Sequence, residues 1–128
     1  MKRRVCLLSL LMVVFPAISA IAHHSYGEYD RDKVVTLEGS VKVVSWANPH
    51  VLITLQTDSQ GDYTVEWNAL AQLYRQGIKP GIVKSGDHLA ITGSINRNPE
   101  KRILALVREI RRPADGWRWS NNWTAPVK

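Results

Sequence analysis

The sequence predicts a mainly β protein, and three features indicate this. Apolar and polar residues alternate through several runs rich in Val, Ile and Thr, as they do in strands with one buried face. Gly, Pro, Asn and Asp cluster between these runs, where they favour turns. One segment alone changes to helical spacing, after the third run. Three strands, a short helix and two strands are the element order of an OB-like fold, a five-stranded Greek-key barrel; a small β-sandwich is the alternative.

The first three expected strands follow one another closely in the chain. The first covers 34–46 and carries Gly39, a residue type that lets a long strand bend or bulge. Asn48-Pro49 ends it, because Pro cannot donate to a sheet ladder. The second strand is expected at 50–57 and the third at 63–67.

The expected helix lies between the third and fourth strands. Its apolar residues Leu70, Leu73 and Tyr74 have the i, i+3, i+4 spacing of one helix face. Asn68 is a suitable N-cap and Gly77 a suitable terminator. The last two strands are expected at 88–93 and 102–111.

The N-terminus has the three-part layout of a cleavable signal peptide. A basic start, Met1-Lys2-Arg3-Arg4, precedes an uncharged apolar run at 5–15, and Ala20-Ile21-Ala22 provides an A-x-A cleavage pattern. The apolar run is too short to span a bilayer. We therefore expect a periplasmic protein with no transmembrane segment in its mature chain. The expected organisation is a signal peptide at 1–22, an OB-like β domain at 23–112 and a Trp-rich C-terminal tail at 113–128.

Charge and cysteine content narrow the function classes. The chain has 17 Lys and Arg against 11 Asp and Glu, a formal charge of +6, and loss of the three basic residues at positions 2–4 leaves 14 and +3. This argues against a nucleic-acid partner. The single cysteine, Cys6, lies in the expected signal peptide, so the mature chain has no thiolate for catalysis or metal binding.

Three histidines are candidate metal ligands: His23, His24 and His50. Cleavage after Ala22 would make His23 the first residue, and its amine and imidazole could chelate Cu(II) with a further nitrogen from His24 or His50. Cleavage after Ala20 would instead make His23 the third residue, which suits square-planar Cu(II) or Ni(II). Copper is therefore the candidate cofactor. The alternative is a solvated histidine pair at a processing site and a His50 that satisfies backbone groups at a turn.

Aromatic and amide side chains offer a second candidate site. Trp46, Asn48 and Trp67 could contact a ligand at the barrel mouth, as aromatic residues do in OB folds. For Trp67, on an alternating strand, core packing is the favoured interpretation. The three Trp of the tail could cover one end of the barrel, contact a partner, or lie at a membrane interface with Arg118, and covering the barrel is the default expectation. They are Trp117, Trp119 and Trp123.

No catalytic constellation is recognisable, so an enzyme is the less favoured class. Ser25 follows His24 but lacks the glycines of a nucleophile elbow, and the acidic residues are scattered singly. The sequence instead predicts a periplasmic binding or accessory module that holds a copper-type metal through its histidines. The alternative is a module that binds a protein, a glycan or an envelope component through aromatic residues.

The chain also resembles an uncharacterised family of small exported bacterial proteins, over roughly 22–110. The resemblance implies export and a compact β domain and transfers no activity. The motifs that carry it are Ala22-His23-His24-Ser25, Tyr29-Asp30, Thr36-Leu37-Glu38-Gly39, Trp46-x-Asn48-Pro49-His50, Glu66-Trp67, Leu70–Leu73 with Arg75-x-Gly77, and Lys84-Ser85-Gly86-Asp87-x-Leu89.

Overall fold

The structure is a computed structural model and describes residues 26–121. Strands dominate it, with one short α-helix and two single-turn 3₁₀ helices, so the mainly β prediction is confirmed. The elements in chain order are η1 (Tyr26–Glu28), β1 (Tyr29–Ser45), β2 (Leu52–Thr57), β3 (Gly61–Glu66), α1 (Leu70–Arg75), β4 (His88–Asn96), η2 (Pro99–Lys101), β5 (Ile103–Arg112) and β6 (Trp117–Ser120).

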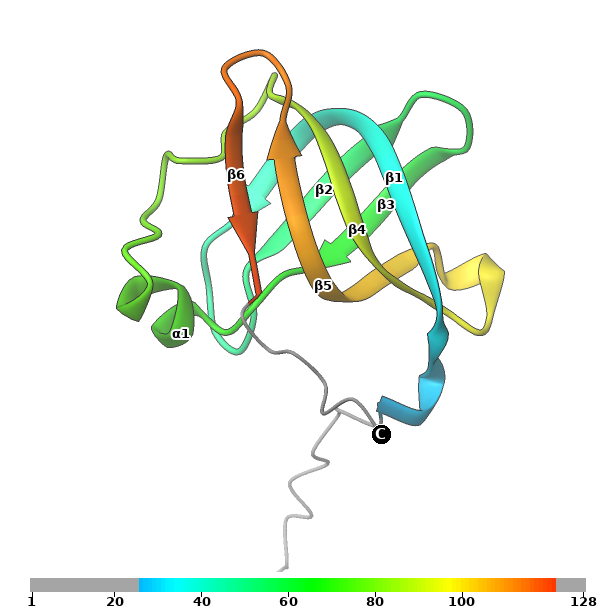
Figure 1. The fold of residues 1–128 in the computed structure, drawn as a ribbon. Helices are drawn as coiled ribbons and strands as arrows, with labels where there is room; N and C mark the ends of the chain where they lie inside the picture. Colours follow the sequence, from blue (N-terminus) through cyan, green and yellow to red (C-terminus); the bar gives the residue numbers. More distant parts are fainter. Residues whose placement is uncertain (1–25, 122–128) are drawn as a thin grey trace, which may run out of the picture.

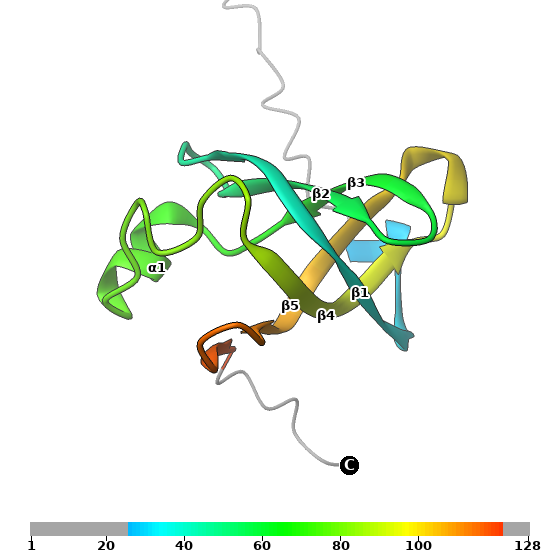
Figure 2. The ribbon, with the colours of Figure 1, turned by 90° about the horizontal axis from the view of Figure 1, so that it is seen from above.

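The six strands form one sheet in the order β3-β2-β1-β4-β5-β6. Neighbours in this order are antiparallel, and β3 also pairs in parallel with β5, through Thr64 with Ile103 and Val65 with Leu104. The sheet is strongly curved, and α1 lies at one side between the end of β3 and the start of β4 (Figures 1 and 2). The expected helix position, after the third strand, is therefore correct.

The strand count of five is wrong, because a sixth strand follows Pro113. β6 pairs with β5 in the register of Trp119 with Ile110, within the segment that the sequence analysis assigned to the tail. The turn between them has Gly116 at φ +74°, with its amide donating to the Arg112 carbonyl at 3.0 Å. β6 has only four residues, which is the lower limit at which alternation indicates a strand.

β1 begins at Tyr29 and is longer than expected, and it changes partner along its length. Its first part pairs with β4 and its last part with β2, and Gly39 pairs with both. A Cβ at Gly39 would lie 2.2 Å from the Gln56 carbonyl oxygen and 2.7 Å from Thr57 Cα. Gly39 therefore permits a close approach of β2 at the crossing, in agreement with the bend expected there. Residues 30–33 are all charged and carry no apolar alternation, which explains why the start of β1 was missed.

The interior is filled from all six strands and from α1, which contributes Leu73. The N-cap of α1 is Ala69, which makes no side-chain hydrogen bond, and not the expected Asn68. Gly77 follows the helix at φ +78°. Within 26–121 no helix combines the length and the apolar character needed to cross a bilayer. The buried apolar core residues are Leu37, Val41, Val51, Ile53, Leu55, Tyr63, Val65, Trp67, Leu73, Val83, Leu89, Ile91, Leu104, Val107, Ile110 and Trp119.

Candidate functional site at the corner between β1 and β2

The segment 46–51 forms a corner that joins β1 to β2 and contacts the end of β3. The Asn48-Pro49 peptide bond in it is cis. The Trp67 amide donates to the Val51 carbonyl at 2.8 Å, and the Val51 amide donates to the Asn68 carbonyl at 3.2 Å. These two hydrogen bonds attach the last residue of the corner to the chain that leaves β3 towards α1 (Figure 1). The side chains before Val51 are therefore held on a fixed backbone.

Three tryptophan rings pack one against the next beneath the corner. The Trp46 and Trp67 ring centroids are 6.0 Å apart at 59°, and those of Trp67 and Trp119 are 5.2 Å apart at 83°. Such tilted and edge-to-face pairs stabilise beyond the area they bury. Trp119 also donates from Nε1 to Gln76 Oε1 at 2.9 Å, which connects β6 to the end of α1. Trp67 is only 2 % exposed, so it supports Trp46 and presents no ring face of its own to a ligand.

The indole nitrogen of Trp67 is unusual. Nε1 is buried and has no hydrogen-bond partner within residues 26–121. A buried donor left unsatisfied costs about 1–3 kcal/mol. A ligand whose hydrogen-bond acceptor reaches this nitrogen would therefore gain more binding free energy than a ligand whose acceptor meets a solvated donor on the surface.

A polar cluster lies beside the same end of β3. The Tyr29 hydroxyl donates to Glu66 Oε2 at 3.4 Å, although 37 residues separate the two in the chain. Burial, followed by the nearby Glu66 carboxylate, raises the pKa of Tyr29 to about 12, so its hydroxyl stays protonated at neutral pH. Asn96, which is 5 % exposed, donates to Glu28 Oε2 at 3.2 Å, and Lys101 Nζ lies 2.8 Å from the same oxygen.

This cluster was missed by the sequence analysis. Tyr29 and Glu66 both belong to motifs of the family resemblance, but nothing in the sequence indicated that they contact each other. Spacing along the chain could not pair them, because the contact depends on how the start of β1 and the end of β3 meet. Asn96 ends β4 and carried no signal at all.

The structure brings together the ligand-binding candidates Trp46, Asn48 and Trp67 at the corner. Trp46 is half-buried against the core, and Asn48 is exposed. The metal candidate His50 is half-buried at the same corner. His23 and His24, like the expected signal peptide, lie outside the described residues. Within 26–121, no group of three or more His, Cys, Asp and Glu side chains could hold a metal ion.

His88 occupies a different part of the sheet. Its Nε2 lies 3.1 Å from Asp58 Oδ2, and both side chains are exposed. Asp58 follows β2, whereas the corner precedes it, so the two sites are separated by the length of a six-residue strand, roughly 20 Å. His88 is therefore a matched control for His50.

Arg112 organises a second polar cluster, between the loop before β4 and the β5–β6 turn. It donates to the Asp87 carboxylate at 2.9 Å and to the Ile82 carbonyl at 2.7 Å, and from Nε to Asp115 at 3.1 Å. Its guanidinium carbon is 5.2 Å from the Trp117 ring centroid. The hydrogen bond to Asp115 raises the pKa of Arg112, and the same bond lowers the pKa of Asp115. Because all three of its nitrogens are engaged by internal acceptors, this guanidinium is a structural tie.

Comparison with known proteins gives a family and no activity. A family model described as a family of unknown function, DUF6152, matches residues 11–105, which is most of the chain. The expected membership of an uncharacterised family is thereby confirmed. No curated protein and no solved structure matches the chain.

Proposed function

We propose that this chain, which belongs to the DUF6152 family of unknown function, is an exported binding module whose binding end is the corner at 46–51. Its ligand is a copper-type transition metal ion held by the nitrogens of His50, His23 and His24. The observation that carries the proposal is that the corner, with His50 and a supported Trp46, lies at the end of the sheet where the described chain begins.

The path of the chain supports this. Tyr29 hydrogen-bonds to Glu66, the residue before Trp67, and the Trp67 amide bonds to Val51 of the corner. Tyr26–Glu28 form η1, and two residues lead back from Tyr26 to His24, a reach of roughly 7 Å at full extension. Imidazole and amine nitrogens are suitable ligands for Cu(II), and the mature chain would offer no competing thiolate.

The scaffold that we propose is an OB-like barrel, with the small β-sandwich as the alternative. The parallel pairing of β3 with β5 joins two strands that are otherwise separated by β2, β1 and β4, as barrel closure requires. The helix between β3 and β4 is also in the position typical of this fold. The Thr64 amide donates to the Arg102 carbonyl at 2.9 Å, on the β5 side. Exchange protection of this amide comparable to that of β2 would support closure, and rapid exchange of it would favour an open sheet.

The test is a Cu(II) titration of the chain purified from the periplasm, with its N-terminus defined by mass spectrometry. We expect one tight site, weakened in the His23→Ala and His24→Ala variants. The comparison is a synthetic peptide with the sequence of residues 23–30, which has the N-terminal nitrogens without the corner. Equal Cu(II) affinity of the peptide and the protein would contradict a site that includes the corner.

A second candidate is supported by Trp46 itself. A half-exposed indole whose inner side packs on Trp67 is a rigid platform on which a protein, a glycan or another envelope component could stack. The test is a pull-down from envelope fractions with wild type and the Trp46→Ala variant. Recovery of the same partners at the same yield with both would reject this candidate.

A further inference from the structure

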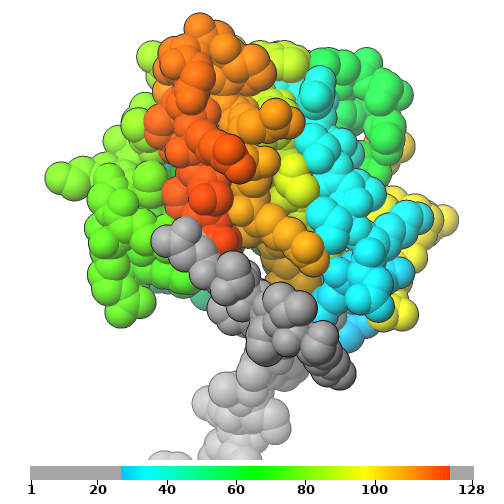
Figure 3. Space-filling model, viewed as in Figure 1, coloured from blue at the N-terminus to red at the C-terminus, as the bar shows by residue number. Residues whose placement is uncertain are grey.

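Charge is unevenly distributed over the described residues. The segments 74–87 and 111–118 contain six Lys and Arg against two Asp and Glu, whereas the rest of 26–121 contains seven against nine. The two basic segments are neighbours in space, because Arg112 donates to the Ile82 carbonyl and Trp119 donates to Gln76. Figure 3 shows β6 and its turn beside the green segment that follows β3, on one side of the molecule. We call this side the basic face.

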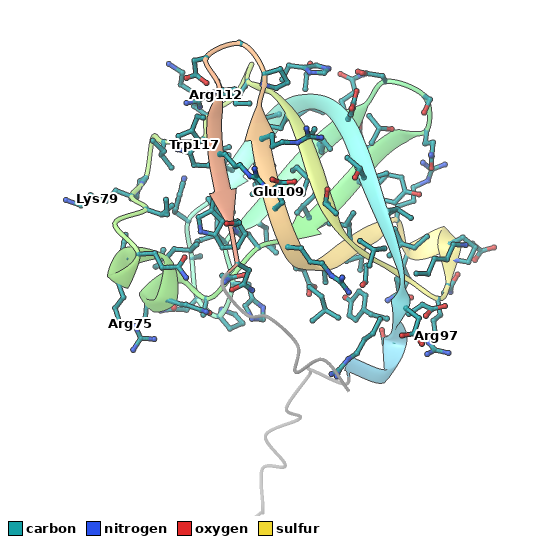
Figure 4. The ribbon with its side chains drawn as sticks, viewed as in Figure 1. Arg75, Lys79, Arg97, Glu109, Arg112 and Trp117 are labelled. Atoms are coloured by element: carbon teal, nitrogen blue, oxygen red, sulfur yellow. The ribbon has the colours of Figure 1, made fainter. Side chains whose placement is uncertain are left out.

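Three cations of the basic face are free to bind an external anion. Arg75, Lys79 and Lys84 are exposed, and within 26–121 none of them has an acidic partner. The two acidic residues of the face are both engaged by Arg112. Arg75 and Lys79 project outward on the same side as Trp117 and Arg112 (Figure 4).

Two further cations of the face, Arg111 and Arg118, share one carboxylate. Both contact Glu109, Arg111 at 3.7 Å, yet each remains more than half exposed. One carboxylate cannot neutralise two guanidinium groups, so an excess positive charge extends along β6 as well.

Aromatic side chains accompany these charges. Tyr74, next to Arg75, is 48 % exposed, and Trp117 is half-exposed between Arg112 and Arg118. Tyr and Trp rings with neighbouring Arg and Lys are the side chains that accumulate in the headgroup region of membranes. We propose that the basic face docks the protein on an anionic phospholipid surface, with the cations on the phosphates and the two aromatic rings at headgroup depth.

The form of the face favours lipid over an acidic protein. Its hollows are shallow: one of about 170 Å³ lies between Arg112 and Arg118, and one of about 320 Å³ lies between Lys84 and Asp115. A stable protein interface buries about 800 Å² per partner, around a desolvated and closely packed centre. A fluid headgroup layer needs no such complementarity, since each cation finds its own phosphate. The inference does not depend on metal binding at the corner.

The test is co-sedimentation with vesicles containing phosphatidylglycerol and with vesicles of phosphatidylcholine alone. The variant Arg75→Gln/Lys79→Gln removes two cations of the face. The matched control Lys33→Gln/Arg97→Gln removes two exposed cations, for which the structure gives no ion pair, from β1 and from the far side of the molecule (Figure 4). Both variants have the same net charge and the same N-terminal sequence, so neither property can cause a difference in vesicle binding between them.

Two lost cations should lower the vesicle partition coefficient about 30-fold, whereas the control should stay within about threefold of wild type. Binding should also weaken when salt rises from about 0.1 M to about 1 M, because the Debye length falls from about 10 Å to about 3 Å. Equal losses in the two variants would reduce the effect to net charge and overturn the proposal. Equal binding to anionic and neutral vesicles would overturn it too, as would absence of binding to anionic vesicles. If the protein fails to bind anionic vesicles but binds an acidic polypeptide saturably, the partner of the basic face is a protein.

Discussion

The two ends of β2 are stabilised by different kinds of contact. The start of β2, which we call the corner end, is where Trp46, Trp67 and Trp119 pack together, with the Tyr29–Glu66 hydrogen bond alongside. Beyond its other end, the charged end consists of the ion pairs His88–Asp58, Lys42–Asp62 and Arg112–Asp87.

This difference indicates where a precise binding site can form. Two of the three ion pairs at the charged end are exposed, and exposed pairs contribute about 0–1 kcal/mol and are screened by salt. The corner end owes its order to buried indole surface, which salt does not weaken. A side chain that packs against the indoles of the corner is therefore held in position, whereas one in an exposed ion pair of the charged end is free to move.

The largest expected effect is at the corner end. Trp67→Ala removes the central ring of the three and leaves a cavity in the core. We expect a loss of about 3–5 kcal/mol in the free energy of unfolding, measured by urea denaturation. A loss below about 1 kcal/mol would contradict the view that Trp67 supports the corner.

At the charged end, Arg112→Met should cost about 1–3 kcal/mol. The aliphatic stem is retained, but the Asp87 carboxylate, whose side chain is 11 % exposed, loses its cation and keeps only the Lys84 amide, at 3.0 Å, as a donor from the described residues. Arg97→Met, which removes an exposed cation without an ion pair, should change stability by less than about 0.5 kcal/mol. Equal losses in the two variants would show that Arg112 is not a structural tie.

Tyr29 makes the stability of the corner end depend on pH. Its pKa is raised from 10.0 to about 12, so its folded state keeps the proton while the unfolded chain loses it. The stability from this group is therefore complete below pH 10 and is lost as pH rises from 10 to about 12. The tyrosinate absorbance difference between wild type and Tyr29→Phe should show a single group that titrates near pH 12. Titration of that group near pH 10 would contradict burial beside Glu66.

The smallest effect is expected for His88→Ala, at less than about 0.5 kcal/mol, because its pair with Asp58 is exposed. The difference from wild type should shrink further as salt is raised, because salt screens the attraction between exposed charges. A loss of 2 kcal/mol or more in thermal or urea unfolding would mean that the charged end is as ordered as the corner end.

Much of the fold could be predicted because it depends on local pattern. Alternating Val, Ile and Leu residues predicted the β class, and the i, i+3, i+4 spacing predicted α1 between the third and fourth strands. Gly39 was expected at a bend, and a neighbouring backbone does approach it too closely for any other residue. β6 was missed because it has only four residues. Its only signal in the sequence was the alternation of Trp117-Arg118-Trp119.

The candidate site could be predicted only in part. The corner residues Trp46, Asn48 and His50 were recognisable because they are adjacent in sequence. Contacts such as Tyr29 with Glu66, or Trp67 with Trp119, join residues 37 and 52 positions apart, and these depend on strand order and register. The basic face has the same origin, since its two segments are separate in the chain.

The most direct test of the account compares Cu(II) affinity in wild type, His50→Ala and His88→Ala, measured in parallel by titration. Both substitutions remove one imidazole, but only His50 belongs to the corner, and the two are separated by roughly the length of β2. We predict an affinity at least about tenfold lower in His50→Ala and unchanged in His88→Ala. Equal affinity in all three proteins would contradict a metal site at the corner.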